Sequence, residues 1–483
     1  MKITIMGIPI MGGYFLKLAN VMIVTFLFLL STGVGSAQIF YVDPGNSIQA
    51  AVNNSTAGDL ILVKPGEYRE NIVVNISGLT VSSEFGNPDE VIIRARDRNS
   101  SVFRLTADNI TIRGFNITGL EEPFNVSQSS NMTGNLNITE NSDSGYNSTE
   151  TGKNNESDKT GNFNKTAETD GADESHEINE TEMYDSAPDE AGSEWNEIGC
   201  LPAGICLELA DNCTIEKNNL SDNQFGIYIQ NSMNTTLSEN NFSRNSVWLE
   251  EWCAENLLVN NTIEGSSLIL GANCWNNTIS QNKLLNGEGI SIACCGGNNI
   301  VAGNEIINCS TGIDIYDVQA KTEFRDNKIM DCEYGISLSF IFGSQVYNNT
   351  IVNSSTGIFL REDCHTNKVF NNTISSCRES GLYLLDQSSD NSIFNNYFNN
   401  SVNVKLENIE GNNTWNSTKM PGNNIIGGPY LGGNFWADLN GSGFSQLSND
   451  SDSDGICDLA YTVNGSDIDY LPLCKPPLFK KWF

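Results

Sequence analysis

The chain has few basic residues for its length, and this shortage excludes two classes of partner. Its 483 residues include 26 Lys and Arg against 59 Asp and Glu, so the formal net charge is −33. A protein that binds nucleic acid through the phosphates needs a basic footprint. Docking on anionic lipid needs clustered basic residues as well. We therefore expect neither nucleic acid nor an anionic membrane surface as a partner.

Charged residues and long apolar runs are also scarce. With 18% charged residues, 43 Gly and 12 Pro, the composition fits neither a coiled coil nor collagen. The run Val21–Leu30 has about ten residues, whereas a membrane-spanning helix needs about 20. Lys17 precedes this run and the small residues Gly35–Ala37 follow it, a pattern typical of a secretory signal. We predict a signal peptide over residues 1–37, no membrane span in the mature chain, and a secreted or cell-surface protein.

A short phrase, Gly-Ile-x-Leu or a close variant, recurs from residue 204 onward. Its copies are spaced by 20 to 24 residues, with weaker copies at Ser246, Ser267 and Asn403. A second phrase, Asn followed two residues later by an apolar residue, runs in phase with it. Three residues before each Asn stands another apolar residue. The Asn residues of this second phrase are 218, 240, 261, 282, 304, 327, 349, 372 and 396.

This repeat predicts an all-β solenoid of about 22 residues per coil. The stretches alternate apolar and polar residues, which is strand patterning. Gly, Asn, Ser and Asp separate the stretches, and these residues tolerate left-handed turns. Successive coils then stack about 4.8 Å apart, with internal ladders of Ile, Leu and Asn. We predict a single-stranded parallel β-helix.

Two other solenoids do not fit the repeat. A leucine-rich repeat needs an apolar residue five positions before the Asn, and this column is polar, as at Asn256, Asn277 and Asn367. A Ca²⁺-binding nonapeptide roll needs Gly-Gly-x-Gly-x-Asp, which the chain lacks.

The ends and one interruption complete the predicted organisation. Residues 38–120 read as an N-terminal cap and the first coils, with a short helix at Ser47–Val52 whose N-cap is Ser47. Residues 121–199 hold 19 Asp and Glu against 3 Lys, and we predict a disordered insertion in one turn. Residues 200–411 are the main repeats, and residues 412–483 form a C-terminal cap with an Asp-rich loop.

Several of these segments together resemble one family. They are the Ser47–Val52 cap, Lys64-Pro65-Gly66-Glu67-Tyr68, the repeats, and Gly433-Asn434-Phe435-Trp436-Ala437-Asp438. This set resembles the NosD-like right-handed parallel β-helix proteins of the pectin-lyase-like superfamily, over residues 39–120 and 200–474. The resemblance implies a right-handed coil and a prokaryotic surface protein. The family takes its name from an accessory factor for copper-enzyme maturation, while other superfamily members bind or cleave polysaccharides. Fold analogy alone does not choose between these roles.

The sequence contains few residues that could bind copper. Imidazole and thioether groups are its usual ligands, but the mature chain has only His176 and His365, and its Met residues are scattered.

The thirteen Cys residues all lie between residues 200 and 474. Equivalent positions in neighbouring coils are close enough for disulfides, and an exported protein permits them. We consider Cys309–Cys332, one bond among Cys253, Cys274, Cys294 and Cys295, and Cys457–Cys474. A buried ladder of free thiols is an equal alternative. A thiolate metal site at Cys253, Cys274, Cys294 and Cys295 is a third.

An acidic run resembles a Ca²⁺ loop. Alternating carboxylates with a Gly for the turn suit a hard cation, and Asp450, Asp452, Asp454 and Asp458 supply them. Tyr461 stands where an EF-hand has Glu, so this is not an EF-hand. We predict Ca²⁺ at these four residues, with an acidic surface turn as the alternative.

Two sets of outward side chains are candidates for cleaving or binding a glycan. Asp314, Asp317, Arg361 and Asp386, with His365 near them, are weak catalytic candidates, and a solvated polar face explains them as well. Five aromatic residues are candidate sugar platforms or half-buried packing: Tyr228, Trp248, Trp252, Phe359 and Tyr383.

The chain has 29 Asn-x-Ser/Thr sequons, and many of them arise from the Asn repeat itself. Seven in the insertion have no such explanation, and we expect N-glycosylation there. They are Asn125, Asn131, Asn137, Asn147, Asn155, Asn164 and Asn179.

The sequence therefore favours a non-catalytic cell-envelope or carbohydrate-interacting β-helix, with a polysaccharide or envelope glycan as partner. A polysaccharide lyase or glycoside hydrolase is the first alternative, and a NosD-like copper accessory protein the second. The insertion contributes −16 of the −33, so the coils themselves are only modestly acidic.

Overall fold

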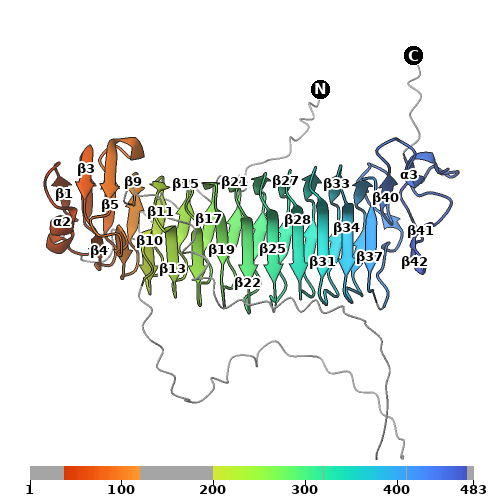
Figure 1. Ribbon diagram of the computed structural model, residues 1–483, viewed down its shortest axis with the longest axis horizontal. Coiled ribbons are helices and arrows are strands. Elements are labelled where there is room, and N and C mark those ends of the chain that lie inside the picture. The colour runs from red at the N-terminus through yellow and green to blue at the C-terminus, as the bar shows by residue number, and fades with distance from the viewer. Residues whose placement is uncertain (1–36, 120–199, 319, 410, 476–483) are drawn as a thin grey trace, which may run out of the picture. The chain divides into compact units, whose positions relative to one another are not determined.

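Three long parallel sheets wind around one interior, and each turn of the chain adds one strand to each sheet (Figure 1). A computed structural model describes residues 37–119, 200–318, 320–409 and 411–475. These residues confirm the predicted right-handed parallel β-helix, with about 13 turns of about 22 residues. They belong to one structural unit, which excludes residues 125–198. The predicted signal peptide, apart from Ala37, and the predicted insertion lie outside the described residues.

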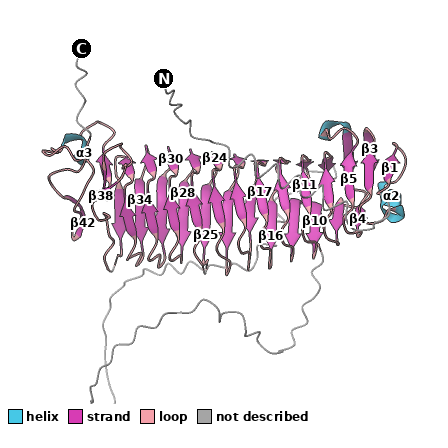
Figure 2. Ribbon diagram, turned by 180° about the vertical axis from the view of Figure 1, so that it is seen from behind, coloured by secondary structure: helices cyan, strands magenta, loops and turns pink. Residues whose placement is uncertain are grey.

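We call the three sheets A, B and C, in the order in which the chain passes through them. Strands of sheets A and B have mostly three residues, and those of sheet C have mostly four to six (Figure 2). Sheet A contains β1 (Ile39–Val42), β2 (Leu60–Val63), β5 (Thr80–Ser83), β8 (Thr111–Arg113), β11 (Thr214–Glu216), β14 (Thr236–Ser238), β17 (Leu257–Val259), β20 (Thr278–Ser280), β23 (Ile300–Ala302), β26 (Glu323–Arg325), β29 (Gln345–Tyr347), β32 (Lys368–Phe370) and β35 (Ser392–Phe394). Sheet B contains β3 (Gly66–Arg69), β6 (Val91–Arg94), β9 (Asn116–Thr118), β12 (Asn219–Ser221), β15 (Asn241–Ser243), β18 (Thr262–Glu264), β21 (Lys283–Leu285), β24 (Glu305–Ile307), β27 (Lys328–Met330), β30 (Thr350–Val352), β33 (Thr373–Ser375), β36 (Tyr397–Asn399) and β40 (Phe435–Ala437). Sheet C contains β4 (Ile72–Val74), β7 (Phe103–Leu105), β10 (Ala203–Glu208), β13 (Phe225–Gln230), β16 (Val247–Glu250), β19 (Ser267–Leu270), β22 (Gly289–Ala293), β25 (Thr311–Tyr316), β28 (Tyr334–Ser339), β31 (Thr356–Arg361), β34 (Ser380–Leu385) and β37 (Val404–Glu407).

The remaining elements lie at the ends of the stack or in turns. They are α2 (Ile48–Asn54), the 3₁₀-helix η1 (Pro88–Glu90), α3 (Phe444–Leu447), and two antiparallel pairs, β38 (Met420–Pro421) with β39 (Tyr430–Leu431) and β41 (Tyr461–Asn464) with β42 (Asp467–Asp469).

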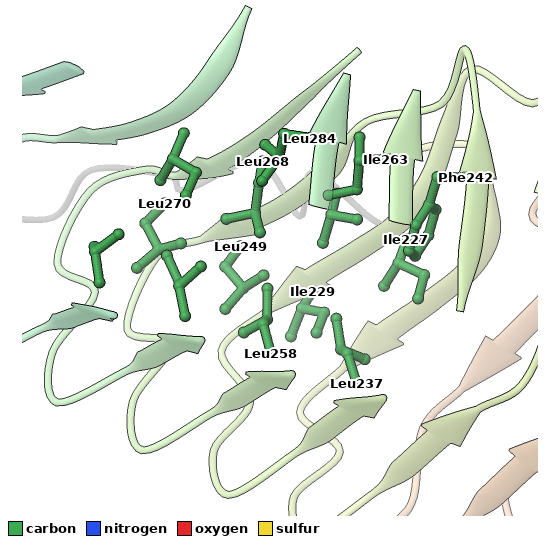
Figure 3. Close-up of a cluster of buried hydrophobic side chains, with 14 of the residues drawn as sticks. Ile227, Ile229, Leu237, Phe242, Leu249, Leu258, Ile263, Leu268, Leu270 and Leu284 are labelled. Carbon is green, nitrogen blue, oxygen red and sulfur yellow. The ribbon is translucent and has the colours of Figure 1, made fainter. Parts of the chain in front are cut away.

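Apolar side chains fill the interior because every strand alternates inward and outward residues. In a three-residue strand such as β18 the central residue, Ile263, is buried and its neighbours are not. Figure 3 shows the resulting stack, in which Ile, Leu and Phe residues from successive turns meet across the three sheets. At about 25 cal/mol per Å² of apolar surface removed from water, this continuous core is the main stabilising term.

A column of Asn carboxamides joins each turn to the next, as the sequence predicts. In each step the backbone N–H and the side-chain N–H of one Asn donate to the side-chain oxygen of the Asn one turn on, with side-chain nitrogen to oxygen distances of 2.9 to 3.1 Å. The other side-chain N–H donates to a backbone carbonyl, as from Asn304 to Ile279. Every polar atom of the buried carboxamide is thus bonded, which removes the cost of burying it.

A second Asn column, which the sequence did not reveal as a ladder, occupies the polar positions that exclude a leucine-rich repeat. Asn256 donates to Asn277, Asn277 to Asn299, and Asn391 to Asn413 in the same pattern. Thr322 and Ser344 continue the column, since the Thr322 N–H donates to the Ser344 hydroxyl. The polar column is therefore structural.

The Gly of the repeated Gly-Ile-x-Leu phrase is needed because neighbouring turns approach closely there. A Cβ added at Gly312, Gly335 or Gly357 would collide with the carbonyl oxygen of the Gly one turn on. Their backbone angles are not left-handed, so the requirement is one of space. A side chain here would push two turns apart.

The predicted N-terminal helix and its N-cap are confirmed. Helix α2 follows Ser47, whose hydroxyl accepts the Ala50 N–H at 3.1 Å. The Glu70 carboxylate accepts the backbone N–H groups of Ile48 and Gln49, which places a negative charge at the helix N-terminus. Buried Ile48 and Val52 face the first coils.

At the C-terminal end, Asn434 of the Gly-Asn-Phe-Trp segment is the last step of the first Asn column, because it accepts two bonds from Asn396. The next strand residues stack on the coil below, with Trp436 against Phe398 at 5.1 Å between ring centroids. Asp469 accepts N–H donors from Asn434, Trp436 and Leu471. The buried carboxylate thus ties β42 to the end of the stack.

Removing one carboxamide from the middle of the column should destabilise the stack locally. Asn304→Ala leaves the Ile279 carbonyl and the donors of Asn282 without partners, so we expect a loss of about 2–4 kcal/mol in free energy of unfolding. Urea unfolding and amide hydrogen exchange would measure it. Thr350→Ala, at an exposed strand position, is the control and should change stability little. An equal loss in both variants would contradict the role of the column.

Burial raises the pKa of Asp469 to about 7, against the opposing effect of its three N–H donors. Between about pH 4 and pH 7 the Asp469 carboxyl is protonated in the folded state and ionised in the unfolded state. The stabilisation that this proton gives the folded state is full below about pH 4 and is lost as pH rises through 7. Urea unfolding should be measured for the native chain and for Asp469→Asn across this pH range. Relative to the variant, the free energy of unfolding of the native chain should fall by up to about 1.4 kcal/mol per pH unit. A constant difference would contradict the raised pKa.

Candidate functional site

The outer face of sheet C carries most of the outward residues singled out in the sequence. Its register aligns one outward column along the stack, with one residue per turn. In chain order the column reads Tyr228, Trp248, Ile269, Ser291, Asp314, Ser337, Phe359, Tyr383 and Lys405. Polar and small residues thus occupy the middle, and two groups of aromatic residues lie on either side.

The weak catalytic candidates do not come together. Asp314 has Ser291 and Ser337 as its neighbours in register. Asp317 and Asp386 lie in the turns after β25 and β34, three turns apart, which is about 14 Å along the stack at 4.8 Å per turn. Paired carboxylates of glycosidases are separated by about 5 to 9.5 Å. The repeat spacing places these residues on one side of the stack, and the three repeats between Asp317 and Asp386 are the three turns that separate them.

Two carboxylates in the turns after sheet C are already engaged with other turns. Glu362 accepts the Ser339 hydroxyl at 3.0 Å, and Asp386 accepts from Asn408 at 2.9 Å. These bonds run to opposite sides, toward the preceding turn and toward the following one. His365 lies 3.6 Å from Asp363 across its Nδ1.

Tyr334, Phe359 and Tyr383 form a stacked group that we call the ring strip. Ring centroids are 5.5 Å apart between Tyr334 and Phe359 and 4.7 Å between Phe359 and Tyr383. Phe359 is buried between the other two, which are half-buried. The sequence singled out Phe359 and Tyr383 but missed Tyr334, which precedes the repeated Gly and is offset from their column.

Two cations flank the ring strip. The Lys405 ammonium lies 4.1 Å from the centre of the Tyr383 ring, and the Arg361 guanidinium lies 5.8 Å from the Phe359 ring. Lys405 also pairs with Glu407 at 3.2 Å, and the Tyr383 hydroxyl donates to Glu407. Burial, and then the bond to Glu407, raise the pKa of Tyr383, so its hydroxyl stays protonated.

Arg361 differs from the other cations of this face. Among the described residues it makes no ion pair, and its Nε atom is buried without a hydrogen-bond partner. An unpaired buried donor is costly. Beside three aromatic rings, the guanidinium carries a positive charge that no carboxylate among the described residues pairs with.

The other aromatic candidates lie away from the ring strip. Tyr228 is buried, with 3% of its surface exposed, and packs with Phe225, Trp248 and Cys206. Trp252, in the turn after β16, is 59% exposed. A second outward stack, Tyr347, Phe370 and Phe394, lies on sheet A. Spacing alone did not separate buried rings from available ones.

Three of the four Asp residues of the acidic loop gather at one point. The nearest carboxylate oxygens of Asp450, Asp452 and Asp454 lie within 4.8 Å of one another. Asp458 instead accepts from the Ser451 backbone and hydroxyl. Lys419 pairs with Asp454 and already supplies positive charge there. Ca²⁺ binding by this loop stays a prediction, now with three carboxylates as its ligands.

The cysteines are arranged differently from the pairs considered in the sequence. Cys200 and Cys206 form a disulfide that the repeat gave no reason to expect, since Cys200 precedes the first repeated phrase. Cys253, Cys274, Cys309, Cys332, Cys457 and Cys474 are free and buried. Burial is the first cause that raises the pKa of Cys309 and of Cys332, which keeps both thiols protonated at neutral pH. In this structure these six residues are unbonded buried thiols, four in the coils and two in the C-terminal cap.

In the part of the chain that the structure describes, no helix has the length and apolar character to cross a membrane. The predicted glycosylation sites of the insertion, Asn125 to Asn179, lie outside the described residues.

Comparisons with known proteins place the chain in a family. The family model "Periplasmic copper-binding protein (NosD)" matches residues 163–317 and 269–441. A cell surface glycoprotein of Methanothermus fervidus is 32% identical over 108 residues, which are 21% of this chain and 17% of that protein. The chain thus matches about a sixth of this relative's length.

Solved structures with related coils are more distant in sequence. The A-module of the Azotobacter vinelandii mannuronan C-5 epimerase AlgE4 is 11% identical, with a TM-score of 0.47 over 76% of this chain and 92% of that one. The catalytic domain of a GH87 α-1,3-glucanase, in complex with nigerose, is 12% identical, with a TM-score of 0.48 over 80% of this chain and 69% of that one. Similarity this remote says nothing about what this chain binds.

The two ranges that match the family model together span residues 163–441, which is more than half of the chain. They include the repeats whose Asn columns and three sheets are described above. This chain belongs to the NosD family.

Proposed function

We propose that this NosD-family β-helix works outside the cytoplasm, at the cell surface, as a non-catalytic protein that binds a polysaccharide or envelope glycan. The ligand lies along the outer face of sheet C, over the ring strip. The observation that carries this proposal is the unpaired guanidinium of Arg361 beside three stacked aromatic rings.

Aromatic rings and fixed polar groups together suit a sugar chain. The apolar faces of sugar rings pack on aromatic side chains, while hydroxyl or carboxylate oxygens need hydrogen-bond donors. Tyr334 and Tyr383 present half-buried rings, and Arg361 and Lys405 supply donors on the same face. A parallel stack also repeats about every 4.8 Å, so an extended polymer can contact several turns at once.

The position of the carboxylates favours binding over cleavage. A lyase or hydrolase needs an acid and a base around one bond, and Asp314 has serines on both sides of it in the sheet. Glu362 and Asp386 are bonded to different turns. The catalytic candidates named from the sequence are therefore not paired as an acid and a base in the described residues.

Copper handling, the second alternative, is favoured by the printed description of the family. The Nδ1 atom of His365 lies 3.6 Å from a carboxylate oxygen of Asp363. Met233 and Met420 are exposed at opposite ends of the repeat region. The glycan-binding proposal therefore rests on more contacts of this chain than the copper proposal does.

Tyr383→Ala should weaken glycan binding about tenfold or more, which corresponds to about 1.4 kcal/mol, because it removes a half-buried ring and its contact with Lys405. A glycan array would select the ligand, and calorimetry would measure the dissociation constants. Phe370→Ala, which removes a ring from the equivalent stack on sheet A, is the matched control and should bind like the native chain. Equal losses in both variants would count against the ring strip.

Arg361→Gln should weaken binding by at least about tenfold, since a charge-assisted bond to a buried donor is worth about 1.5–3 kcal/mol. Arg378→Gln, at an exposed turn position on another face, is its control. Dissociation constants measured with one acidic and one neutral polysaccharide would show which oxygen Arg361 contacts. Native affinity in Arg361→Gln for every glycan that binds would contradict the proposal.

A further inference from the structure

Two thiols differ from all the others in the chain. Of the eleven free cysteines, Cys294 and Cys295 alone are partly exposed, and the other nine are buried. They are adjacent in sequence, in the turn that follows β22. Buried cysteines pack as small apolar residues, but an accessible pair of thiols is a chemical group that a ligand can reach.

The backbone of this turn holds both sulfur atoms together. Consecutive residues of a strand point to opposite faces, but Cys294 and Cys295 both have a left-handed φ of 59°. This turn conformation ends the strand alternation, and the two Sγ atoms lie 3.8 Å apart without a bond between them. Cys294 N–H donates to Tyr316 and Cys295 N–H to Asp317 in the next turn, which fixes the pair.

A carboxylate completes the group. The register of β22 and β25 pairs Ala293 with Tyr316, so Asp317 lies directly after the next strand, one turn on from the thiols. The two sulfur atoms and a carboxylate oxygen of Asp317 all lie within 4.8 Å of one another, and each residue is partly exposed.

We propose that Cys294, Cys295 and Asp317 form a site for a borderline-soft divalent cation such as Zn²⁺, with a fourth position open to water or an external ligand. Zinc takes thiolate and carboxylate ligands in a tetrahedron, with zinc to sulfur distances of about 2.3 Å. Sulfur atoms at two corners of that tetrahedron are about 3.8 Å apart, which is the separation in this structure.

Proton release accompanies this binding. Cysteine ligates a metal ion as the thiolate, so each thiol gives up one proton to solvent as it binds the ion. The thiols lie two turns, and Asp317 one turn, before Tyr334 of the ring strip.

The test uses the full chain, reduced and freed of metal, with Zn²⁺ and Co²⁺ as probes. We expect one ion per chain, with the sulfur-to-cobalt charge-transfer band and the visible absorption of tetrahedral Co²⁺. Cys294→Ser with Cys295→Ser should abolish both signals, and Asp317→Asn should weaken binding about tenfold or more. Asp386→Asn, at the same place in a later turn, and Cys274→Ala, in the buried ladder, should bind normally.

Circular dichroism would show that each variant keeps its β-helix. Absence of stoichiometric binding by the reduced chain would overturn the proposal, as would full binding by the double Ser variant or loss of binding in Cys274→Ala. A Cys294–Cys295 disulfide that persists in the native exported protein and excludes the ion would also overturn it.

Discussion

Every feature of this protein depends on hydrogen bonding between one turn of the chain and the next. A backbone strand needs partners on both edges, and here each turn finds them in the turns before and after it. The two Asn columns extend the same bonding into the corners between sheets, where the backbone ladder is interrupted. Because each carboxamide uses its oxygen twice and both its N–H groups once, the column tolerates burial that would otherwise be costly. The stack cannot be widened locally, as the Gly residues of sheet C show.

This constraint separates positions that maintain the stack from positions that are free to vary. Inward Ile and Leu residues, corner Asn residues and close-contact Gly residues recur in nearly every turn. Outward residues of sheet C and of the turns after it do not recur, and the unusual groups lie there: the ring strip with Arg361, and the thiol pair with Asp317. A solenoid of this kind displays side chains at fixed intervals on a rigid surface, which is why both proposals rest on outward residues of neighbouring turns.

The repeat made the fold predictable, because the Asn-x-apolar phrase recurs without a gap and in phase with a second phrase. The short helix after Ser47 was predictable from its capping residue. The sites were less so. The sequence aligned Asp314, Asp317 and Asp386 as outward residues, yet their mutual distances depend on how many turns separate them. It treated the polar column at Asn256 and Asn277 only as evidence against another repeat, although these side chains form a ladder. Tyr228 and Phe359 both occupy the outward column of sheet C. Tyr228 is buried by Phe225 and Trp248, whereas Phe359 stacks between Tyr334 and Tyr383 in the ring strip.

The central functional claim is that a glycan covers the outer face of sheet C at its C-terminal turns. Hydroxyl-radical footprinting, with the selected glycan present and absent, tests this directly. The account predicts that Tyr334 and Tyr383 become protected on binding, while Phe370 and Phe394 on sheet A react equally in both states. Protection confined to sheet A, or unchanged reactivity of the ring strip under saturating glycan, would contradict it.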